Sequence, residues 1–251
     1  MDKSKVVFLK KPRLKDAILI EGLPGMGYVG KLAAEHLVGE LRAEKFAEMY
    51  SPYFPHYAYV EPGGLLRLAR NEFYYANING KSVVILVGDA QATSPEGHYE
   101  IARKILEVVK RLKIKQIFTL GGYATGRYSE EKPKVIGASN HPEFVELLRE
   151  HGVKIEDGAG PIIGASGLLL SLGKTRGVKG ICLLGETHGV LVDHRSAQAV
   201  LEVLTDILGV KIDMHKLEEL AKRTERIIHR IRKEWKARKP EETEEEISYI
   251  G

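Results

Sequence analysis

The sequence predicts an α/β fold in which helices cover both faces of a mostly parallel β-sheet. Short apolar runs rich in valine, isoleucine and leucine are bounded by glycines, and longer stretches with helical spacing separate them. Continuous apolar runs are typical of strands buried on both faces, as parallel strands are in α/β domains. The chain has 251 residues, of which 43% are hydrophobic and 29% charged, which is enough for one large globular core.

Strands and helices are expected to alternate along residues 1–210, which we take as one domain. The apolar run AILI precedes a glycine loop and a helix, and SVVILV precedes a second helix after the polar loop GDAQATSPEG. Between them, LLRLARNEFYYANING is expected to form a two-stranded excursion with tight turns near Asn71 and at Asn79-Gly80. In order, we expect strands at 17–20, 82–87, 116–120, 134–139 and 180–184, and helices at about 29–41, 97–112, 141–150 and 196–208.

A long helix is expected over 211–239, followed by an acidic tail at 240–251. Apolar side chains recur three and four residues apart in this helix, which gives it one apolar seam. Pro240 and the five glutamates between 241 and 246 end the helix and favour a flexible tail. Because a lone terminal helix must bury its seam, we predict an oligomer interface there, or else packing on the chain's own domain. The predicted interface comprises Leu217, Ala221, Thr224, Ile228, Ile231 and Trp235.

Composition argues against a disulfide-stabilised, metal-binding, secreted or membrane-spanning protein. Cys182 is the only cysteine, so the sequence offers no disulfide framework and no thiolate set for a metal, and we expect neither a metal nor a cofactor. The N-terminal MDKSKVVFLKKP has too short an apolar run for a signal peptide or a membrane span, and a cytoplasmic location is expected. Asparagine and glutamine are scarce while Lys, Arg and Glu abound, a balance associated with thermophiles.

The glycine loop IEGLPGMGYVGKLA comes close to two nucleotide-binding signatures. Gly25, Gly27 and Gly30 have the spacing of a dinucleotide fingerprint, with Glu48 near the distance at which an acid contacts the ribose. A P-loop would need Ser or Thr after Lys31, where Leu32 stands.

The favoured alternative is a structural turn, because glycine tolerates positive φ and close backbone contact. The residues of this structural loop are Gly22, Pro24, Gly25, Gly27 and Gly30.

Polar residues also stand at the ends of predicted strands, where open α/β sheets bind ligands. The cleft candidates are Glu21, Asp89, Gln91, Glu186 and His188, with Glu96, His98 and Asp193 nearby in the sequence. A nucleoside-binding or nucleoside-cleaving enzyme could use Asp89 or Glu186 as base and His188 or His98 as proton shuttle. No nucleophile motif accompanies them, and loop caps or oligomer contacts explain the same residues, so no catalytic residue is assigned.

The basic C-terminal helix raises the question of nucleic acid. Between 216 and 239 there are ten Lys or Arg against four Glu. Glu218 and Lys222, and likewise Glu234 and Arg238, stand four apart in the order that stabilises a solvated helix. Aromatic residues are almost absent from it, so we expect no nucleic-acid partner.

The order of motifs resembles the proteasome assembly chaperone family of the second kind, which has archaeal members. The loop matches that family's G-x-P-G-x-G-x-V-G opening, and YVEPGGLLRL, VGDAQ, GGYATG and GETHG follow in order, so the resemblance covers about residues 15–210. It implies a three-layer α/β/α domain shaped like nucleoside phosphorylases. It also implies a homo-oligomeric, non-enzymatic scaffold that contacts proteasome α subunits as an assembly chaperone or an activator.

Some members of that family dock a C-terminal hydrophobic-Tyr-any motif between proteasome α subunits. Here the chain ends in Ile-Ser-Tyr-Ile-Gly, with the tyrosine third from the end instead of penultimate. The resemblance therefore implies partner-binding roles for Ile247, Tyr249, Ile250 and Gly251, and a terminus without a binding role is the alternative.

Overall fold

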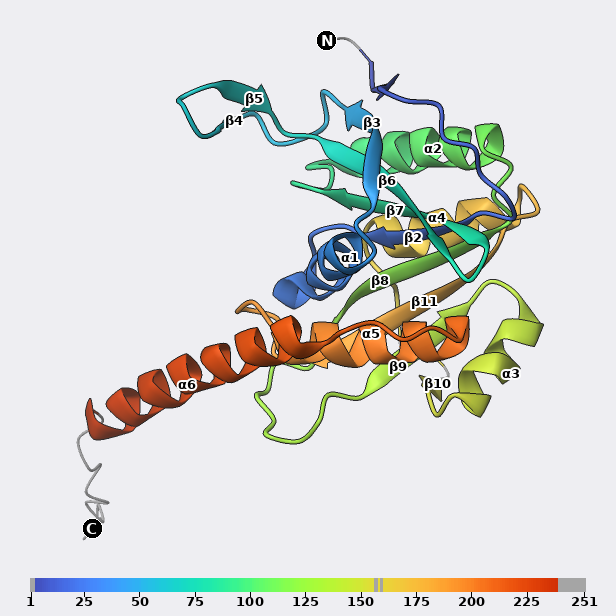
Figure 1. Cartoon of the computed structure of the whole chain (residues 1–251). Coiled ribbons are helices and arrows are strands. Elements are labelled where there is room, and N and C mark those ends of the chain that lie inside the picture. The colour runs from blue at the N-terminus through green and yellow to red at the C-terminus, as the bar shows by residue number, and fades with distance from the viewer. Residues whose placement is uncertain (1–2, 156–157, 159, 239–251) are drawn as a thin grey trace, which may run out of the picture.

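The computed structural model describes residues 3–155, 158 and 160–238, and at 228, 229 and 231–238 it describes the backbone alone. The described chain forms three layers, with helices on both faces of a central sheet, and α6 extends beyond them (Figure 1). The predicted α/β class is thereby confirmed.

Within the described residues, nine strands form the main sheet in the order β1-β3-β6-β7-β2-β8-β11-β9-β10, and β4 and β5 form a separate pair. The central strands β7, β2, β8 and β11 are parallel. Antiparallel pairs flank this centre on both sides. The strands are β1 (Lys5–Phe8), β2 (Ile18–Gly22), β3 (Glu44–Tyr50), β4 (Ala58–Val60), β5 (Leu66–Leu68), β6 (Asn71–Ile78), β7 (Lys81–Gly88), β8 (Gln116–Ala124), β9 (Val135–Ser139), β10 (Lys154–Ile155) and β11 (Lys179–Thr187).

Two hydrophobic layers hold the helices to the sheet. On one face α2 and α4 cover side chains such as Leu19 and Ile117, and on the other α1 and α5 cover Ile20 and Phe118. Alternate residues of β2 and β8 thus enter opposite layers, as the period of a strand requires. The helices are η1 (Met26–Tyr28), α1 (Val29–Glu40), α2 (Pro95–Arg111), α3 (Pro142–Glu150), α4 (Ala165–Lys174), α5 (His194–Leu208) and α6 (His215–Arg238).

The antiparallel flank differs from the sequence-based expectation. Asn79 and Gly80 form the predicted turn, with φ of 48° and 80°, between β6 and β7. Asn71, however, begins β6 instead of lying in a turn, and β5 pairs with β4. The β4–β5 hairpin consequently projects beyond the sheet, which Figure 1 shows.

Candidate functional site

The glycine loop between β2 and α1 packs directly against β8. A Cβ atom at Gly30 would lie 2.0 Å from the carbonyl oxygen of Leu120, and one at Gly22 would lie 2.2 Å from the carbonyl oxygen of Gly30. Gly27 has a φ of 61°, and its Cβ would lie 2.7 Å from Oγ1 of Thr187. At Gly22 and Gly30 the missing side chains thus make room for the protein's own backbone.

Gln91 ties this loop to the start of α4. Its Nε2 donates to the carbonyl oxygen of Pro24 at 2.7 Å, and its Oε1 accepts from the backbone N–H of Ala165 at 2.9 Å. Gly25 accepts a hydrogen bond from the N–H of Tyr28, which closes the turn into α1. Both ends of the Gln91 amide therefore serve to position the backbone.

A cavity of about 710 Å³ lies at the carboxyl ends of the central strands, on the side of α4. Its walls are mostly apolar or glycine, with a few polar groups. They include Leu23, Met26, His98, Tyr123, Ile163 and Ser166. This is the position at which open α/β sheets bind ligands.

Glu21 is buried beside this cavity and is 1% exposed. Its Oε1 accepts from the N–H of Leu23 at 3.0 Å and its Oε2 from Oγ of Ser166 at 3.2 Å. Burial raises the pKa of Glu21 to about 7, although both hydrogen bonds act in the opposite direction. Ser166 lines the cavity and lies between it and the carboxyl group. Through its hydrogen bonds to Leu23 and Ser166, Glu21 links the glycine loop to α4.

Glu21 belongs to a buried polar row across the sheet. Thr119 of β8 stands opposite Glu21 and also opposite Cys182 of β11. All three are buried, and burial raises the pKa of the Cys182 thiol to about 12. A thiol with so high a pKa is a poor nucleophile, since the thiolate is the reactive form.

Glu186 and His188 line a different, smaller cavity of about 230 Å³, next to α5 and α6. Nδ1 of His188 accepts from the N–H groups of Val190 at 3.0 Å and of Leu191 at 3.3 Å. Asp193, which also lines this cavity, caps α5 by accepting from the N–H of Ser196 at 3.1 Å. His188 and Asp193 thus stabilise the turn after β11.

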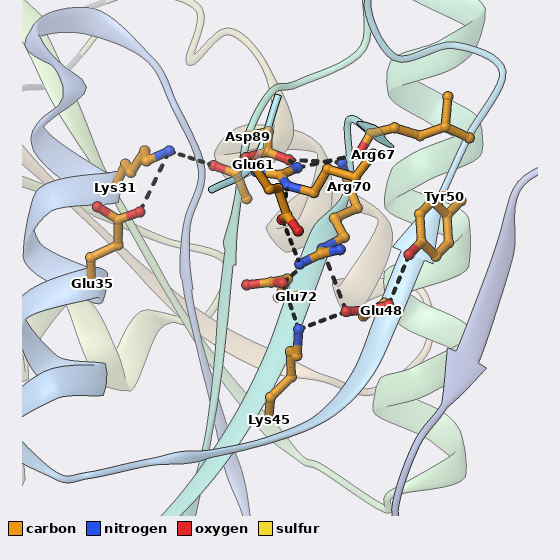
Figure 2. A network of polar contacts seen from close by, with 12 residues as sticks. Lys31, Glu35, Lys45, Glu48, Tyr50, Glu61, Arg67, Arg70, Glu72 and Asp89 are labelled. Carbon is orange, nitrogen blue, oxygen red and sulfur yellow. Dashed lines mark hydrogen bonds and ion pairs between the residues drawn. The ribbon is translucent and has the colours of Figure 1, made fainter. Parts of the chain in front are cut away.

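Asp89 belongs to a third environment, a network of ion pairs at the base of the β4–β5 hairpin (Figure 2). Both of its oxygens accept from Arg67, with Nη2 and Oδ1 3.1 Å apart. Its Oδ2 also accepts from the backbone N–H of Arg70 at 3.0 Å. The Arg67 side chain in turn forms an ion pair with Glu61 at 2.7 Å. Asp89 is therefore fully engaged in holding this hairpin.

The same network continues between β3 and β6. Lys45 donates to Glu48 at 2.6 Å and to Glu72 at 2.9 Å, and Arg70 donates to Glu72 at 2.8 Å (Figure 2). Burial alone would raise the pKa values of Glu48 and Glu72. Hydrogen bonds from Lys45 and from the neighbouring tyrosines, together with the charges of Lys45 and Arg70, hold both pKa values below the usual range. Glu48, the residue considered for a ribose contact, is thus an ion-pair partner.

The structure does not bring the cleft candidates together. Glu21 and Gln91 lie beside the large cavity, Glu186 and His188 beside the small one, and Asp89 in the ion-pair network. Glu96 lies in the first turn of α2, and His98 lines the large cavity. Across the described residues, no group of three or more His, Cys, Asp and Glu side chains is placed to hold a metal ion. This distribution suits structural roles better than acid–base catalysis, which needs the groups at one point.

The apolar seam of α6 begins against the chain's own domain. Leu217 is 2% exposed and packs in the layer that contains α1 and α5, and Ala221 is buried as well. Oγ1 of Thr224 lies 3.2 Å from Nδ1 of His194 at the start of α5. The side chains of Ile228, Ile231 and Trp235 lie outside the described part of the structure. The partner-binding candidates Ile247, Tyr249, Ile250 and Gly251 lie outside it too.

Sequence reasoning missed the partners of several candidates. Ser166 contacts Glu21 across 145 positions of sequence, and Arg67 contacts Asp89 across 22. In LLRLARNEF, Arg67 stands between two leucines, and this was a usable signal, because a strand there places its side chain on the face opposite Leu66 and Leu68. No comparable local pattern marks Ser166.

The PAC2 family model matches residues 19–232, which span the parallel centre, the flanking strands other than β1, and most of α6. The chain belongs to the PAC2 family. This finding confirms the resemblance that the glycine loop and the later motifs indicated.

Relatives of this PAC2 chain cover nearly its whole length. Protein MJ1210 of Methanocaldococcus jannaschii is 40% identical over 95% of this chain and 93% of its own. The crystal structure of Pyrococcus furiosus PbaB, an archaeal proteasome activator, matches with a TM-score of 0.88 and 42% identity over 92% of this chain and all of PbaB. That of P. furiosus PbaA, an archaeal homologue of proteasome-assembly chaperone, matches with a TM-score of 0.77 and 29% identity over 94% of each chain.

The two crystal structures are those of a proteasome activator and of a homologue of proteasome-assembly chaperone, and these matches point to a non-enzymatic role. They agree with the dispersed positions of the cleft candidates. In the described part of the chain, no helix is both long enough and apolar enough to cross a membrane.

Proposed function

We propose that this protein is a homo-oligomeric proteasome-binding scaffold that contacts proteasome α subunits and acts as an activator. The observation that carries the proposal is the match to PbaB, an archaeal proteasome activator, at 42% identity with a TM-score of 0.88. PbaA, described as a homologue of an assembly chaperone, is less similar in both respects. An activator role is therefore favoured over a role in assembly alone.

The proposal assigns one contact with the proteasome to the C-terminal segment. Ile247, Tyr249, Ile250 and Gly251 form an apolar-aromatic end behind a segment, 241–246, that contains five glutamates, and like charges extend a spacer by mutual repulsion. Tyrosine is also among the residue types that dominate binding energy in small interfaces. The family resemblance adds that such ends dock between α subunits.

Self-association is the second part of the proposal. Because Leu217 and Ala221 are already buried within one chain, the predicted α6 interface falls on Ile228, Ile231 and Trp235. We expect a double substitution, Ile228→Asp with Ile231→Asp, to weaken self-association while the α/β domain stays folded. Light scattering for the mass and circular dichroism for the fold measure the two effects separately.

The test of proteasome binding uses immobilised recombinant archaeal proteasome and the full-length protein. We expect saturable binding and faster hydrolysis of a fluorogenic peptide. We expect Tyr249→Ala to weaken binding at least tenfold, about 1.4 kcal/mol. Ser248→Ala, in the same segment, is the matched control and should bind like the unaltered chain.

The outcomes distinguish a contact made by the C-terminal tail from one made by the folded body. If Tyr249→Ala and a chain ending at Glu246 both bind as tightly as the full chain, the folded body makes the contact and the tail assignment is wrong. If the full chain binds neither whole proteasomes nor isolated α subunits, the proposed function itself is wrong.

A further inference from the structure

The β4–β5 hairpin presents an apolar face that no part of the described chain covers. Val60 stands opposite Leu66, and Ala58 stands opposite Leu68, so all four side chains share one face of the pair. Val60 is 71% exposed and Leu66 is 72% exposed. Isolated apolar side chains on a surface are common, but a continuous apolar face on a projecting element is typical of an interaction surface. We call residues 58–68 the finger.

The opposite face of the finger is firmly anchored. Arg67 stands opposite Tyr59, and its guanidinium lies over the Tyr59 ring, 4.5 Å from the centroid. The same guanidinium donates to Asp89 in the network of Figure 2. The N–H of Glu61 donates to the carbonyl oxygen of Leu65 at 2.8 Å and closes the turn. The finger is thus held in one direction, which lowers the entropy lost when a partner binds.

The charge pattern of the finger selects an apolar partner. The tip, PGGLL at 62–66, carries no charged side chain. Next to the tip, the side chains of Glu61 and Arg67 pair with each other at 2.7 Å. A nucleic acid or another strongly charged surface would therefore lose hydration on the tip and gain no ion pair there.

The same chain carries a second uncovered apolar surface, at the carboxyl ends of β2, β8 and β11. We call it the strand-end surface. The N–H of Asp193 donates to the carbonyl oxygen of Gly27 at 2.9 Å, which holds the loop after β11 against η1. Ile163 is 81% exposed and Val190 is 87% exposed. The exposed apolar side chains of this surface are Met26, Tyr28, Ile163, Val190, Leu191 and Val192.

The strand-end surface also contains the opening of a cavity. Met26 and Ile163 both line the cavity of about 710 Å³, whose other walls are mostly apolar or glycine. Such a hollow can receive a projecting leucine side chain, and burying one stabilises a contact more than a flat surface would. The finger tip supplies Leu65 and Leu66.

We propose that the finger of one copy docks on the strand-end surface of a second copy of this chain. The inference rests on the self-association in the proposed function and is independent of proteasome binding. Both surfaces are apolar, and every copy carries one of each, so a single repeated contact covers both. Because the two surfaces differ, the contact is head-to-tail, and its repetition closes a ring when the rotation between copies allows it.

Cross-linking of paired cysteines tests this contact directly. One preparation carries Leu66→Cys and the other Ile163→Cys, and a short thiol cross-linker is added after they are mixed and allowed to exchange. The native Cys182 is buried, with a raised pKa, and stays unreactive in the folded protein. We expect a covalent dimer from the mixture. Leu66→Cys alone should give none, and neither should a mixture in which Leu9→Cys replaces Ile163→Cys, since Leu9 is an exposed leucine beyond β1.

Each result of the cross-linking bears on the proposal. A covalent dimer from Leu66→Cys alone would show finger-to-finger pairing and overturn it. Absence of a dimer in the mixture, when light scattering shows that the protein self-associates, would overturn this contact and leave self-association standing. A monomeric unaltered protein would overturn both this contact and the proposed self-association.

A second measurement identifies the occupant of the finger. We expect Leu65→Asp with Leu66→Asp to weaken self-association at least tenfold, whereas Leu9→Asp leaves it unchanged. If the finger substitutions instead weaken proteasome binding and leave self-association unchanged, the finger docks on the proteasome and the proposal is wrong.

Discussion

Two regions of this PAC2 protein bury carboxyl groups in different ways. At the end of β2, Glu21 is buried with only neutral hydrogen-bond donors, and its pKa rises to about 7. Between β3 and β6, Glu48 and Glu72 are shielded to a lesser degree but lie against Lys45 and Arg70, and their pKa values fall. Desolvation acts upward in both places, so the neighbouring cations decide the sign of the shift.

The two regions also differ in the contacts that hold them together. The parallel centre is held by close backbone contacts, for which Gly22 and Gly30 leave the space. The antiparallel flank is held by ion pairs around Arg67 and Arg70 and carries the projecting finger (Figure 2). A substitution should therefore act through volume in the first region and through charge in the second.

The largest effect is expected from Gly30→Ala. The added Cβ would lie 2.0 Å from a backbone oxygen of β8, so α1 and β8 must separate, and we expect a loss of about 3 kcal/mol in the free energy of unfolding. Gly39→Ala in the same helix is the control. Its Cβ meets nothing within 4 Å, and it should stabilise the helix by about 0.5–1 kcal/mol. Urea unfolding measures both, and equal effects would contradict the packing role of Gly30.

The next effect is the pH dependence that Glu21 imposes. Its folded pKa of about 7 lies above the ordinary value of 4.5, so the folded chain keeps a proton that the unfolded chain loses. The stabilisation that comes from this retained proton is present in full below about pH 4.5. It falls as the pH rises from there to about 7, and above pH 7 it no longer changes.

Glu21→Gln should remove this dependence. We expect the variant to gain on the order of 2–3 kcal/mol relative to the unaltered protein between pH 5 and pH 8, because the amide carries no charge to desolvate. Urea unfolding at the two pH values measures the difference. If the variant and the unaltered protein differ in unfolding free energy by the same amount at pH 5 and at pH 8, the pKa of Glu21 is not raised by folding.

Asp89→Asn tests the charged region. The substitution removes the negative charge from a pair whose side chains are largely shielded from solvent, and we expect a loss of about 2 kcal/mol. Glu44→Gln is the control, because the Lys10–Glu44 pair is well exposed and should contribute little. The urea midpoints of both variants at pH 7 measure the two losses in stability. Equal losses for Asp89→Asn and Glu44→Gln would mean that burial does not strengthen the Asp89–Arg67 pair.

Ser166→Ala should give the smallest effect. It removes a hydrogen bond that lowers the pKa of Glu21, so the pKa should rise further. We expect a loss of about 1 kcal/mol at pH 8 and a smaller one at pH 5, where the carboxyl group is protonated more often. The same substitution in a Glu21→Gln background should lose this pH dependence, and its persistence there would assign it to another group.

Much of the fold could be predicted from the sequence, because local patterns determine it. The apolar runs before the glycine loops are β2, β7 and β8, and the helices α1, α2, α3 and α5 were expected near their observed bounds. The strands β1, β3, β4 and β10 and the helix α4 were missed. β3 mixes charged and apolar residues because its polar side chains form the ion-pair network, and glycines and leucines obscure the helical pattern of α4.

The site could be predicted in part only. The sequence placed Glu21, Gln91 and Glu186 at strand ends, but which strand ends share a cavity depends on the strand order, which no local pattern specifies. The glycine pattern alone left nucleotide binding open, since the same residues serve a phosphate or a close backbone contact. The contacts of Gly22 and Gly30 distinguish these cases, because they show what occupies the space.

The strand order also bears on how the chain folds during synthesis. β2 pairs with β7 and β8, so Ile18 reaches its partners Val83 and Gln116 only after nearly half of the chain has been made. The β6–β7 hairpin, with its turn at Asn79-Gly80, needs no distant segment. Local hairpins form in microseconds, whereas contacts between distant segments form late. We therefore expect the β6–β7 hairpin to form first and β2 to keep one edge unpaired on the ribosome until β8 has emerged, which makes this apolar strand a segment in need of protection from aggregation.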